Sequence, residues 1–347
     1  MSPRVPLCEE ESAVMSAHTW AGRTVVVTGG TGFIGSHFVE ELLARQAHVI
    51  RLYRTGSRHP SSDLPGNDRL RTIRVDLCDE PAVRRVFAWA PGGVDAVVHC
   101  AAMWGSAGYR YDHPATVFEA NFRPVANVLK CAQEHGVTDV VLLGSGEIYK
   151  APTARPLREE DDFRTAVRYT TDGYYLAKLH EEMLADSYRH EHGMNVFRPR
   201  LTGIYGPRDN FAADADRVIP AMIAHAAADR DIVVWGDGSQ TRTYMYVTDL
   251  VRAVLHMVAT NKHHTLNVGT SETVSMRDLA HLVCAALGKP SRITFDPDKP
   301  TGRSNRTLDL TRLDGILDFR PRGLREGLVQ TAHWYLRNRI VSSQREP

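Results

Sequence analysis

The feature that most constrains the fold is a short run of β-branched residues that leads into glycines and then into a helical pattern. Residues 24–28 (Thr-Val-Val-Val-Thr) carry no charge, which is typical of a strand buried on both faces in a parallel sheet. A glycine-rich turn occupies 29–35, and apolar residues recur at helical spacing over 38–43. This order suits a pyrophosphate, because glycines let the backbone approach the phosphates and the helix N-terminus offers unpaired N–H groups. We therefore expect a nucleotide-binding unit here.

The spacing of the glycines fits two patterns. Gly30, Gly32 and Gly35 match G-x-G-x-x-G, while Gly29, Gly32 and Gly35 match G-x-x-G-x-x-G. Either pattern alone could also be an ordinary tight turn between a strand and a helix. Because a strand and a helix flank the glycines in the required order, the nucleotide interpretation is favoured.

The composition restricts the class of protein. The 347 residues suffice for one large α/β domain or two lobes, and a formal charge of +1 indicates neither a nucleic-acid nor a membrane surface. No apolar run approaches the roughly 20 residues of a membrane-spanning helix. Residues 1–22 contain Glu9, Glu10 and Glu11 in place of an apolar signal-peptide core, which predicts a disordered leader. Five widely spaced cysteines form no metal motif, so we expect a soluble cytoplasmic protein without a metal site.

Strands and helices alternate over the first two thirds of the chain. After the first strand, further strands are predicted at 47–53, 71–77, 94–102 and 139–145, and helices at 81–89 and 115–134. This alternation predicts an α/β fold with a doubly wound parallel sheet of the Rossmann type. In such sheets, ligands bind beyond the carboxyl ends of the strands.

From about residue 201 the alternation loosens, which predicts a second, smaller lobe. A helix is expected at 218–228, and short strands at 231–235 and 244–247. We expect the following division of the chain: a cofactor-binding domain over 23–200 with a returning segment over about 243–269, a discontinuous substrate lobe over 201–242 and 270–340, and a tail over 341–347.

The end of the second strand bears on the choice of cofactor. An acidic side chain about 20 residues past the glycines would bind the ribose 2′-hydroxyl of NAD. That place holds Tyr53 and Arg54, with Arg58 nearby, and two guanidiniums suit a 2′-phosphate. The pattern favours NADP, with NAD and an ordinary solvated loop end as alternatives. Asp76, after the third strand, is placed either for an adenine amino group or for a helix cap.

Three residues have the chemistry of a proton-transfer site. Tyr174 and Lys178 are four positions apart in a predicted helix and therefore share a face. We expect the lysine charge to lower the pKa of the phenol, which would make Tyr174 a proton donor or acceptor near neutral pH. Ser145 ends the fifth predicted strand, at the ligand-binding edge of the sheet. Each feature is common by itself, but the three occur in one order behind the glycine turn.

This set of motifs resembles the extended short-chain dehydrogenase/reductase family, which contains NDP-sugar epimerases, dehydratases and ketoreductases. The resemblance covers about residues 23–340 and is strongest to the GDP-L-fucose-synthase-like 4-ketoreductases. The matching segments, in family order, are 28–35, Asp76-Leu77, 99–102, Asn121, Ser145 with Ile148-Tyr149, Tyr174 with Lys178, Tyr205-Gly206-Pro207, 218–220 and 233–242.

The resemblance implies roles for residues that composition and spacing cannot assign. It implies catalytic roles for Ser145, Tyr174, Lys178 and Glu147. It implies contacts with NADP(H) for Gly29, Gly32, Phe33, Ile34, Gly35, Tyr53, Arg54, Arg58, Asp76, Leu77, Ala101, Ala102, Lys178 and Leu201. It implies contacts with a sugar nucleotide for Trp104, Glu147, Asn210, Arg217, Val218, Trp235, Arg242 and Arg306, with Arg242 and Arg306 on the diphosphate.

The chain departs from the family pattern at positions where fucose synthase epimerises its substrate. The cysteine two residues after the serine is Glu147 here, and the histidine before Val218 is Arg217. A guanidinium stays charged, so Arg217 is a poor proton donor and double epimerisation is not expected. Leu201 and Gly203 replace a proline and an asparagine, which implies different substrate contacts.

Glu147 leaves several chemical roles open. Related 4,6-dehydratases are similar in having a glutamate at this place, where it removes the C5 proton of a 4-keto sugar. The residue that assists them is Gly146 here, so dehydration is less expected than reduction. A single epimerisation by Glu147, or a hydrogen bond to a sugar hydroxyl without catalysis, also fits.

The sequence therefore predicts an NADP(H)-dependent reductase of the 4-keto group of a nucleotide-linked 4-keto-6-deoxy sugar, with Tyr174 as the general acid. The alternative is a 4-epimerase or 4,6-dehydratase that recycles a bound NAD(P), with Glu147 as the C5 base. A non-catalytic NADP sensor is a third hypothesis, which the intact Ser145, Tyr174 and Lys178 disfavour. The resemblance also implies a homodimer, in which the helices over 115–134 and 174–190 form a four-helix bundle across a two-fold axis.

Overall fold

The computed structural model describes residues 20–56, 67–105, 107–149, 155–163, 170–212, 217–299 and 307–343. Within these residues the largest sheet has eight strands in the order β11-β7-β5-β4-β1-β2-β3, with β6 paired to β7. All its pairs are parallel, which confirms the predicted α/β class with a parallel, Rossmann-like sheet. Its strands are β1 (Thr24–Thr28), β2 (His48–Tyr53), β3 (Leu70–Arg74), β4 (Ala96–His99), β5 (Asp139–Leu142), β6 (Gly144–Ser145), β7 (Asn195–Leu201) and β11 (Thr265–Val268).

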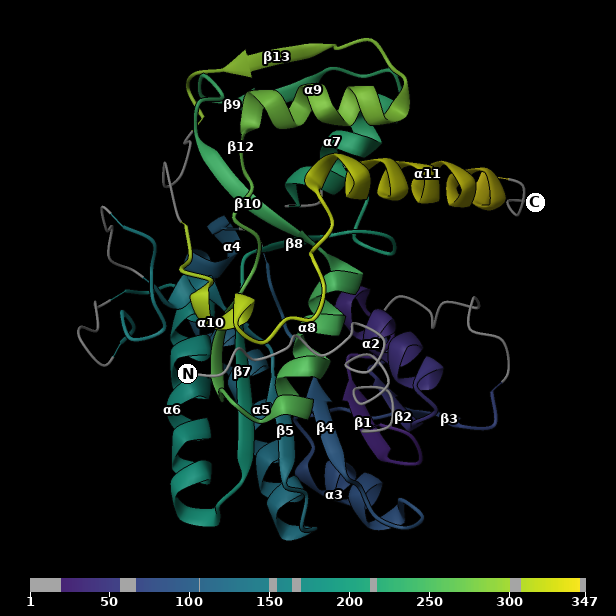
Figure 1. The fold of residues 1–347 in the computed structure, drawn as a ribbon, viewed down its shortest axis with the longest axis vertical. Helices are drawn as coiled ribbons and strands as arrows, with labels where there is room; N and C mark the ends of the chain where they lie inside the picture. Colours follow the sequence, from purple (N-terminus) through teal and green to yellow (C-terminus); the bar gives the residue numbers. More distant parts are fainter. Residues whose placement is uncertain are drawn as a thin grey trace, which may run out of the picture.

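Helices cover both faces of this sheet, as a strand without charges requires (Figure 1). Val25 and Val27 of β1 belong to one core, with residues of α2 and α8, while Val26 belongs to a second core with residues of α3, α5 and α6. The alternation follows the two-residue period of a strand. The covering helices are α2 (Phe33–Ala44), α8 (Val247–Thr260), α3 (Glu80–Trp89), α5 (Pro114–Glu134) and α6 (Gly173–His192).

A smaller group of elements lies above the large sheet in Figure 1 and has its own core. Its three-stranded sheet joins β8 (Gly203–Tyr205), β10 (Thr241–Tyr246) and β12 (Thr273–Ser275), and a two-stranded sheet joins β9 (Ile232–Trp235) and β13 (Ile293–Asp296). The helices here are α7 (Val218–Ala227), α9 (Met276–Leu287) and α11 (Leu324–Ser343). The short helices α4 (Ala107–Asp112), η1 (Gly146–Ile148) and α10 (Thr311–Asp314) complete the described elements.

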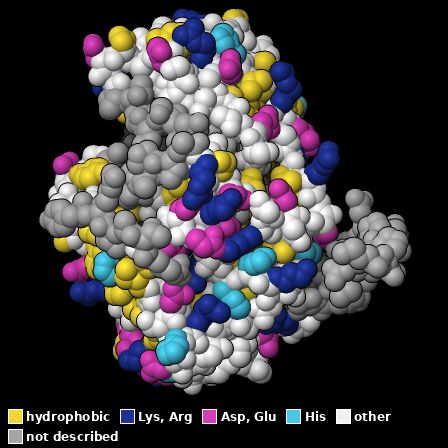
Figure 2. Space-filling view, turned by 60° about the vertical axis from the view of Figure 1, so that its left-hand side comes forward, with side chains coloured by type: hydrophobic (Ala, Val, Ile, Leu, Met, Phe, Trp, Pro, Cys, Tyr) yellow, Lys and Arg dark blue, Asp and Glu magenta, His cyan; other side chains and the backbone are white. Residues whose placement is uncertain are grey.

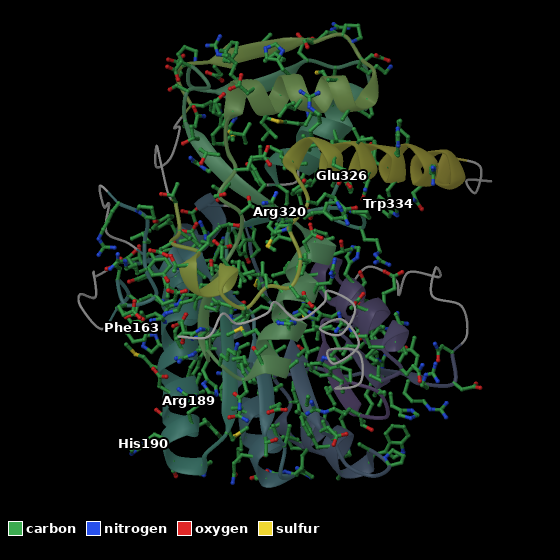
Figure 3. The ribbon with its side chains drawn as sticks, in the orientation of Figure 1. Phe163, Arg189, His190, Arg320, Glu326 and Trp334 are labelled. Atoms are coloured by element: carbon green, nitrogen blue, oxygen red, sulfur yellow. The ribbon has the colours of Figure 1, made fainter. Side chains whose placement is uncertain are left out.

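The last helix follows a segment that contains Arg320, and Glu326 and Trp334 lie along it (Figure 3). Trp334 packs against Phe211, with 5.8 Å between the ring centroids. The helix is thereby joined to the loop that follows β8. No helix in the described part of the chain is long and apolar enough to cross a membrane.

Several element boundaries differ from the sequence prediction for local reasons. The strand predicted at 139–145 is two strands, since β5 ends at Leu142 and β6 pairs with β7 alone. The strand predicted at 71–77 ends at Arg74, because the chain turns at Asp76, whose Oδ1 accepts the N–H of Cys78 at 2.9 Å.

Surface charge is mixed, as the net charge of +1 suggests. On the face shown in Figure 2, the basic and acidic side chains are interspersed and do not form separate fields. This face therefore has no extended basic surface of the kind that binds nucleic acid.

A buried ionic network fixes β7 against its neighbours. The Arg200 guanidinium donates to Glu182 of α6 at 2.8 and 2.5 Å, to Asp162 at 2.6 Å and to the hydroxyl of Tyr149 at 2.7 Å. Tyr149 in turn donates to Asn267 of β11 at 2.6 Å. Buried charges need such partners, so the network commits these segments to one arrangement.

Candidate active site

The glycine turn after β1 is a close-packed cradle at the N-terminus of α2. Gly29 has φ +60°. A Cβ there would lie 2.8 Å from the N of Ala101, and a Cβ at Gly35 would lie 2.2 Å from the O of Gly29. Gly32 caps α2 without a side-chain hydrogen bond, so the first N–H groups of the helix stay available. These features fit the diphosphate of a dinucleotide, whose negative charge the helix N-terminus favours.

The structure also separates the two glycine patterns. Gly29 and Gly35 are required by close backbone contacts, whereas a Cβ at Gly30 would meet first the side chain of Arg51, at 2.6 Å from Cγ. The spacing that matters is therefore that of Gly29, Gly32 and Gly35. Arg51 is buried beside this turn, and its Nη1 has no hydrogen-bond acceptor among the described residues.

The residues expected to choose the cofactor lie at the end of β2 and after β3. Tyr53 is half-buried and Arg54 is exposed, while Arg58 lies outside the described residues. The capping alternative for Asp76 is wrong, because the N-cap of α3 is Asp79, which accepts the N–H of Ala82 at 3.1 Å. The adenine contact of Asp76 stays a prediction.

Two elements bring Ser145 and Tyr174 together. Ser145 ends β6, and its Oγ accepts the N–H of Glu147 at 3.1 Å. Tyr174 lies in the first turn of α6, where Asp172 caps the helix. Gly173 permits this placement, since a Cβ there would lie 2.2 Å from the O of Pro114 on α5.

Lys178 lies one turn after Tyr174 and is held firmly. Its Nζ donates to the carbonyl of Leu143 at 3.0 Å and to Oε2 of Glu181 at 2.8 Å, and lies 5.8 Å from the centroid of the Tyr174 ring. Burial by itself would lower the pKa of Lys178, but Glu181 and Tyr174 outweigh burial, and the pKa is raised. The ammonium therefore stays charged beside the phenol.

The pKa of Tyr174 shifts in the direction opposite to the sequence expectation. Burial raises it, and this effect exceeds the lowering by the Lys178 charge and by a hydrogen bond with Ser145. The sequence shows the lysine but not the depth at which the phenol lies. In this environment Tyr174 keeps its proton at neutral pH, which suits a proton donor.

A cavity of about 600 Å³ opens in front of these residues. Of the residues predicted from the sequence, those on its wall are Ile34, Trp104, Ser145, Glu147, Tyr174, Leu201, Arg217, Val218 and Arg242. They come from β6 and β7 of the large sheet, from α2, η1 and α6, from the loop after β4, and from α7 and β10 of the smaller group of elements. The cavity therefore lies between the large sheet and the smaller group of elements, and Ile34 in the first turn of α2 is on its wall.

Two described residues that were predicted to bind substrate do not line this wall, and a third lies outside the described residues. Trp235 is half-exposed at the end of β9, with Lys299 Nζ 5.9 Å from its ring centroid. Asn210 uses its Oδ1 to accept the N–H of Ala212 at 3.1 Å. Arg306 lies outside the described residues. Their contacts with a sugar nucleotide stay predictions.

Arg217 connects the two sides of the cavity. Its Nη2 donates to the carbonyl of Ile204 at 2.7 Å and to Asp209 at 3.0 Å, and its guanidinium carbon lies 5.4 Å from the ring centroid of Phe33. Asp209 is buried. A permanently charged, doubly held group of this kind suits anion binding better than proton transfer.

The wall also contains residues that the sequence reasoning missed. They are Arg110, Tyr111, Gly144, Asp172, Thr202, Ile204, Thr243, Tyr244 and Leu308. Gly146, Gly203, Tyr205, Ile219 and Pro220 also line the cavity and belong to positions that were compared with the family pattern above. Thr202 and Thr243 could have been found because each directly follows a predicted site residue, Leu201 and Arg242 respectively. Arg110 gave no signal, because an arginine before a tyrosine in a short helix is ordinary. Among the described residues no group of three or more His, Cys, Asp or Glu side chains could hold a metal ion.

Comparison with known proteins places these features in a family. The chain is 46% identical over 321 residues to a dTDP-4-dehydro-6-deoxy-D-allose reductase of Streptomyces bikiniensis, covering 92% of this chain and 98% of the relative. It is 30% identical over 279 residues to the GDP-L-fucose synthase of Escherichia coli, covering 76% and 86%.

A solved structure matches over nearly the whole length. The dTDP-glucose 4,6-dehydratase of Streptomyces venezuelae, determined with NAD bound, gives a TM-score of 0.79 at 25% identity, covering 92% of this chain and 98% of that chain. The sequence model of the NAD dependent epimerase/dehydratase family matches residues 25–269, which include the glycine turn, Ser145, Tyr174 and Lys178. The chain therefore belongs to the NAD dependent epimerase/dehydratase family, the extended short-chain dehydrogenases/reductases, and is an enzyme of that family.

Proposed function

We propose that the protein reduces the 4-keto group of a nucleotide-linked 4-keto-6-deoxy sugar with NADPH. The observation that carries the proposal is the cavity that joins Ser145, Tyr174 and Glu147 to Arg217 and Arg242 of the upper elements. A redox site and cationic side chains for a diphosphate thus share one space. The 46% identity to a reductase of a dTDP-linked 4-keto-6-deoxy sugar supports the same chemistry.

The side chains have complementary roles in this proposal. When bound, reduced nicotinamide supplies a hydride for C4 and is left oxidised. Tyr174 donates its phenol proton to the C4 oxygen, so the ketone becomes a hydroxyl, and Ser145 hydrogen-bonds that oxygen beforehand. Lys178, held by Leu143 and Glu181, keeps its charge beside Tyr174 and steadies the phenolate that the proton leaves behind.

NADP is proposed over NAD because of the charge at the end of β2. Tyr53 and Arg54 stand where an NAD-binding chain would carry a carboxylate. A carboxylate would repel a 2′-phosphate, whereas a guanidinium binds it in a bidentate manner. The buried Arg51 beside the glycine turn adds a second cation on this side.

A second candidate function is favoured by Glu147, whose place on the cavity wall lets it reach a sugar carbon. A 4-epimerase or 4,6-dehydratase would oxidise and then reduce its own substrate, and in the dehydratase Glu147 would be the C5 base. Such an enzyme keeps its dinucleotide. Cofactor released from the denatured protein as stoichiometric NAD⁺ would favour this candidate, whereas an empty or NADPH-binding site favours net reduction.

Oxidation of NADPH tests the proposal. Purified protein is mixed with NADPH and with dTDP-, GDP-, UDP- and CDP-linked 4-keto-6-deoxyhexoses, and absorbance at the nicotinamide band is followed. We expect one NADPH oxidised for each sugar reduced by at least one member of the panel. No oxidation with any member would refute the function.

Tyr174→Phe removes the proton donor. It should lower kcat by about 10²- to 10⁴-fold and leave NADPH affinity unchanged. Tyr188→Phe, which removes one hydroxyl from the same helix away from the cavity, is the matched control and should keep its activity.

A further inference from the structure

Arg110 of α4 is a buried cation on the cavity wall with no role in the function proposed above. The residue is only 8% exposed, yet it lines the cavity that contains Ser145 and Tyr174. Burying a guanidinium is costly unless hydrogen bonds replace its water. The position therefore needs a physical reason.

Two aromatic rings hold the guanidinium in place. Its central carbon lies 4.8 Å from the ring centroid of Trp104 and 5.5 Å from that of Tyr174. The two rings are themselves in edge contact, with centroids 4.6 Å apart and planes at 74°. The distances from the guanidinium carbon to the Trp104 and Tyr174 rings are both within the range of a cation–π interaction. The stacking fixes the plane of the guanidinium and therefore the directions of its N–H groups.

Two nitrogens of this guanidinium lack acceptors in the described part of the chain. Neither Nε nor Nη1 of Arg110 has a hydrogen-bond partner among the described residues. The Asp172 carboxylate is 4.0 Å from Nε, which is too long for a hydrogen bond. A planar, oriented and unsatisfied pair of donors at a ligand cavity indicates that the ligand supplies the acceptors.

The position of Arg110 indicates which part of the ligand this is. The guanidinium stacks on the ring of Tyr174, which in the proposed function meets the C4 oxygen. Arg217 and Arg242 lie on other elements of the wall, at the start of α7 and on β10. Acceptors within reach of Arg110 therefore belong to the sugar ring and not to the diphosphate.

We propose that Arg110 donates hydrogen bonds to hydroxyl groups of the sugar ring and so sets which hexose, and which face of it, is presented to Tyr174. The proposal rests on the proposed function for the identity of the ligand as a sugar nucleotide. It assigns Arg110 to substrate binding and specificity. It assigns no proton transfer to it.

Binding measurements test this without turnover. The nucleotide is first chosen as the one among dTDP, GDP, UDP and CDP that unmodified protein binds most tightly. Isothermal titration then compares two ligands, this nucleoside diphosphate and its glucose conjugate. Arg110→Met should weaken the glucose conjugate by about 10- to 100-fold, the loss of charge-assisted hydrogen bonds, and leave the nucleoside diphosphate unchanged. Arg110→Lys keeps the charge but loses the planar stack. Its affinity for the glucose conjugate should lie between that of unmodified protein and that of Arg110→Met.

Two further arginine variants serve as controls. Arg242→Met should weaken both ligands alike, because it acts on the part that they share. Arg252→Met removes an exposed guanidinium that stacks on Phe319 at 3.9 Å, away from the cavity, and should change neither affinity. Unchanged thermal unfolding and NADPH affinity establish that Arg110→Met is folded.

Deoxy analogues identify the hydroxyl. In a double-mutant cycle, removal of the 2- or 3-hydroxyl from the conjugate should weaken binding to unmodified protein but have little further effect on Arg110→Met. Additive losses for both analogues would overturn the contact. If Arg110→Met binds the conjugate with unchanged affinity and only kcat is lowered, the proposed contact with the sugar would also be overturned. The stacking of Arg110 on Tyr174 would then serve to position Tyr174. If unmodified protein binds the conjugate but reduces no keto sugar, the proposed reaction fails while these affinities still decide the role of Arg110.

Discussion

Burial decides the protonation state of several side chains around the glycine turn and the cavity. It raises the pKa of Tyr174 and lowers that of His99 to about 3, where the Lys178 charge adds to the effect. His37 on α2 is a third case, with its pKa lowered to about 4, first by burial and then by the charge of Arg208. The neutral ring of His37 donates from Nε2 to the carbonyl of Pro207 at 2.9 Å, and its Nδ1 accepts from Arg208 at 2.8 Å.

Stability should therefore fall in mild acid because of His37. Its pKa in the folded chain, about 4, lies below the ordinary 6.5, so the unfolded chain binds the proton first. The stabilisation is complete above pH 6.5 and is lost as the pH falls toward 4, at about 1.4 kcal/mol per pH unit. Urea unfolding at pH 7, 6, 5 and 4 measures this loss.

His37→Gln supplies the comparison for this measurement. Glutamine can donate to Pro207 and accept from Arg208 but does not titrate, and other groups, including His99, contribute equally to both proteins. The difference in free energy of unfolding between the two proteins should shrink as the pH falls. Parallel curves between pH 7 and 4 would show that His37 does not carry this dependence.

The sequence predicts the chemistry of single residues better than their environment. Ser145 and Tyr174 could be found because a hydroxyl at a strand end and a tyrosine four residues before a lysine follow from order and spacing. The direction of the Tyr174 pKa shift and the role of Arg110 could not, since both depend on depth and on neighbours distant in the chain.

Among the elements, the glycine turn and α2 are the most tightly determined. Gly35 lies in the first turn of α2, where any Cβ would lie 2.2 Å from the O of Gly29, and the contacting atom belongs to the backbone. The carbonyl oxygen of Gly29 cannot move away without displacing the whole turn. The helix and the strand before it therefore depend on this one missing methyl group.

Gly35→Ala should displace the turn and weaken cofactor binding. We expect NADPH affinity to fall at least about 10-fold and the protein to lose about 1–3 kcal/mol of stability, as overpacking does elsewhere. Gly315→Ala, where the nearest atom is 3.4 Å away and φ is negative, is the matched control and should be tolerated. Fluorescence titration with NADPH and thermal unfolding measure both effects, and normal affinity in Gly35→Ala would contradict the role of this contact.

The sequence predicts helix boundaries correctly where the hydrophobic periodicity and the capping residues agree. α5 and α6 lie within two residues of their predicted ends, and Asp172 and Gly193 mark the two ends of α6. The division of 139–145 into β5 and β6 was missed, because an apolar run does not report that pairing with β4 stops at Leu142 while pairing with β7 resumes at Gly144.

For the whole molecule, the outer surface of α5 and α6 is the proposed dimer interface. Most of the apolar residues on these helices are used in the protomer, since Val125 and Leu129 are buried in its own core. Phe118 and Phe122 stack at 5.4 Å near the exposed His180, and Met183 is 37% exposed. A second copy could cover this smaller patch across a two-fold axis.

Light scattering should therefore give the mass of a dimer, and Met183→Glu should shift it to a monomer. A charge at this position would be buried against its own copy in the dimer, whereas it stays in water in the monomer. Trp89→Glu alters a comparably exposed apolar residue on α3 and should leave the dimer intact. A monomeric mass for unmodified protein at micromolar concentration would refute the interface.

The place of β11 at the edge of the large sheet has a consequence for how the protein is made. This strand emerges from the ribosome after β8, α7, β9, β10 and α8, yet its Asn267 holds Tyr149 and the carbonyl of Leu157, behind the cavity wall at Glu147. A nascent chain that ends before β11 can already contain the glycine turn and Arg200, but it lacks Asn267, the second partner of Tyr149. The order of translation thus makes the glycine turn available before the wall of the cavity is complete.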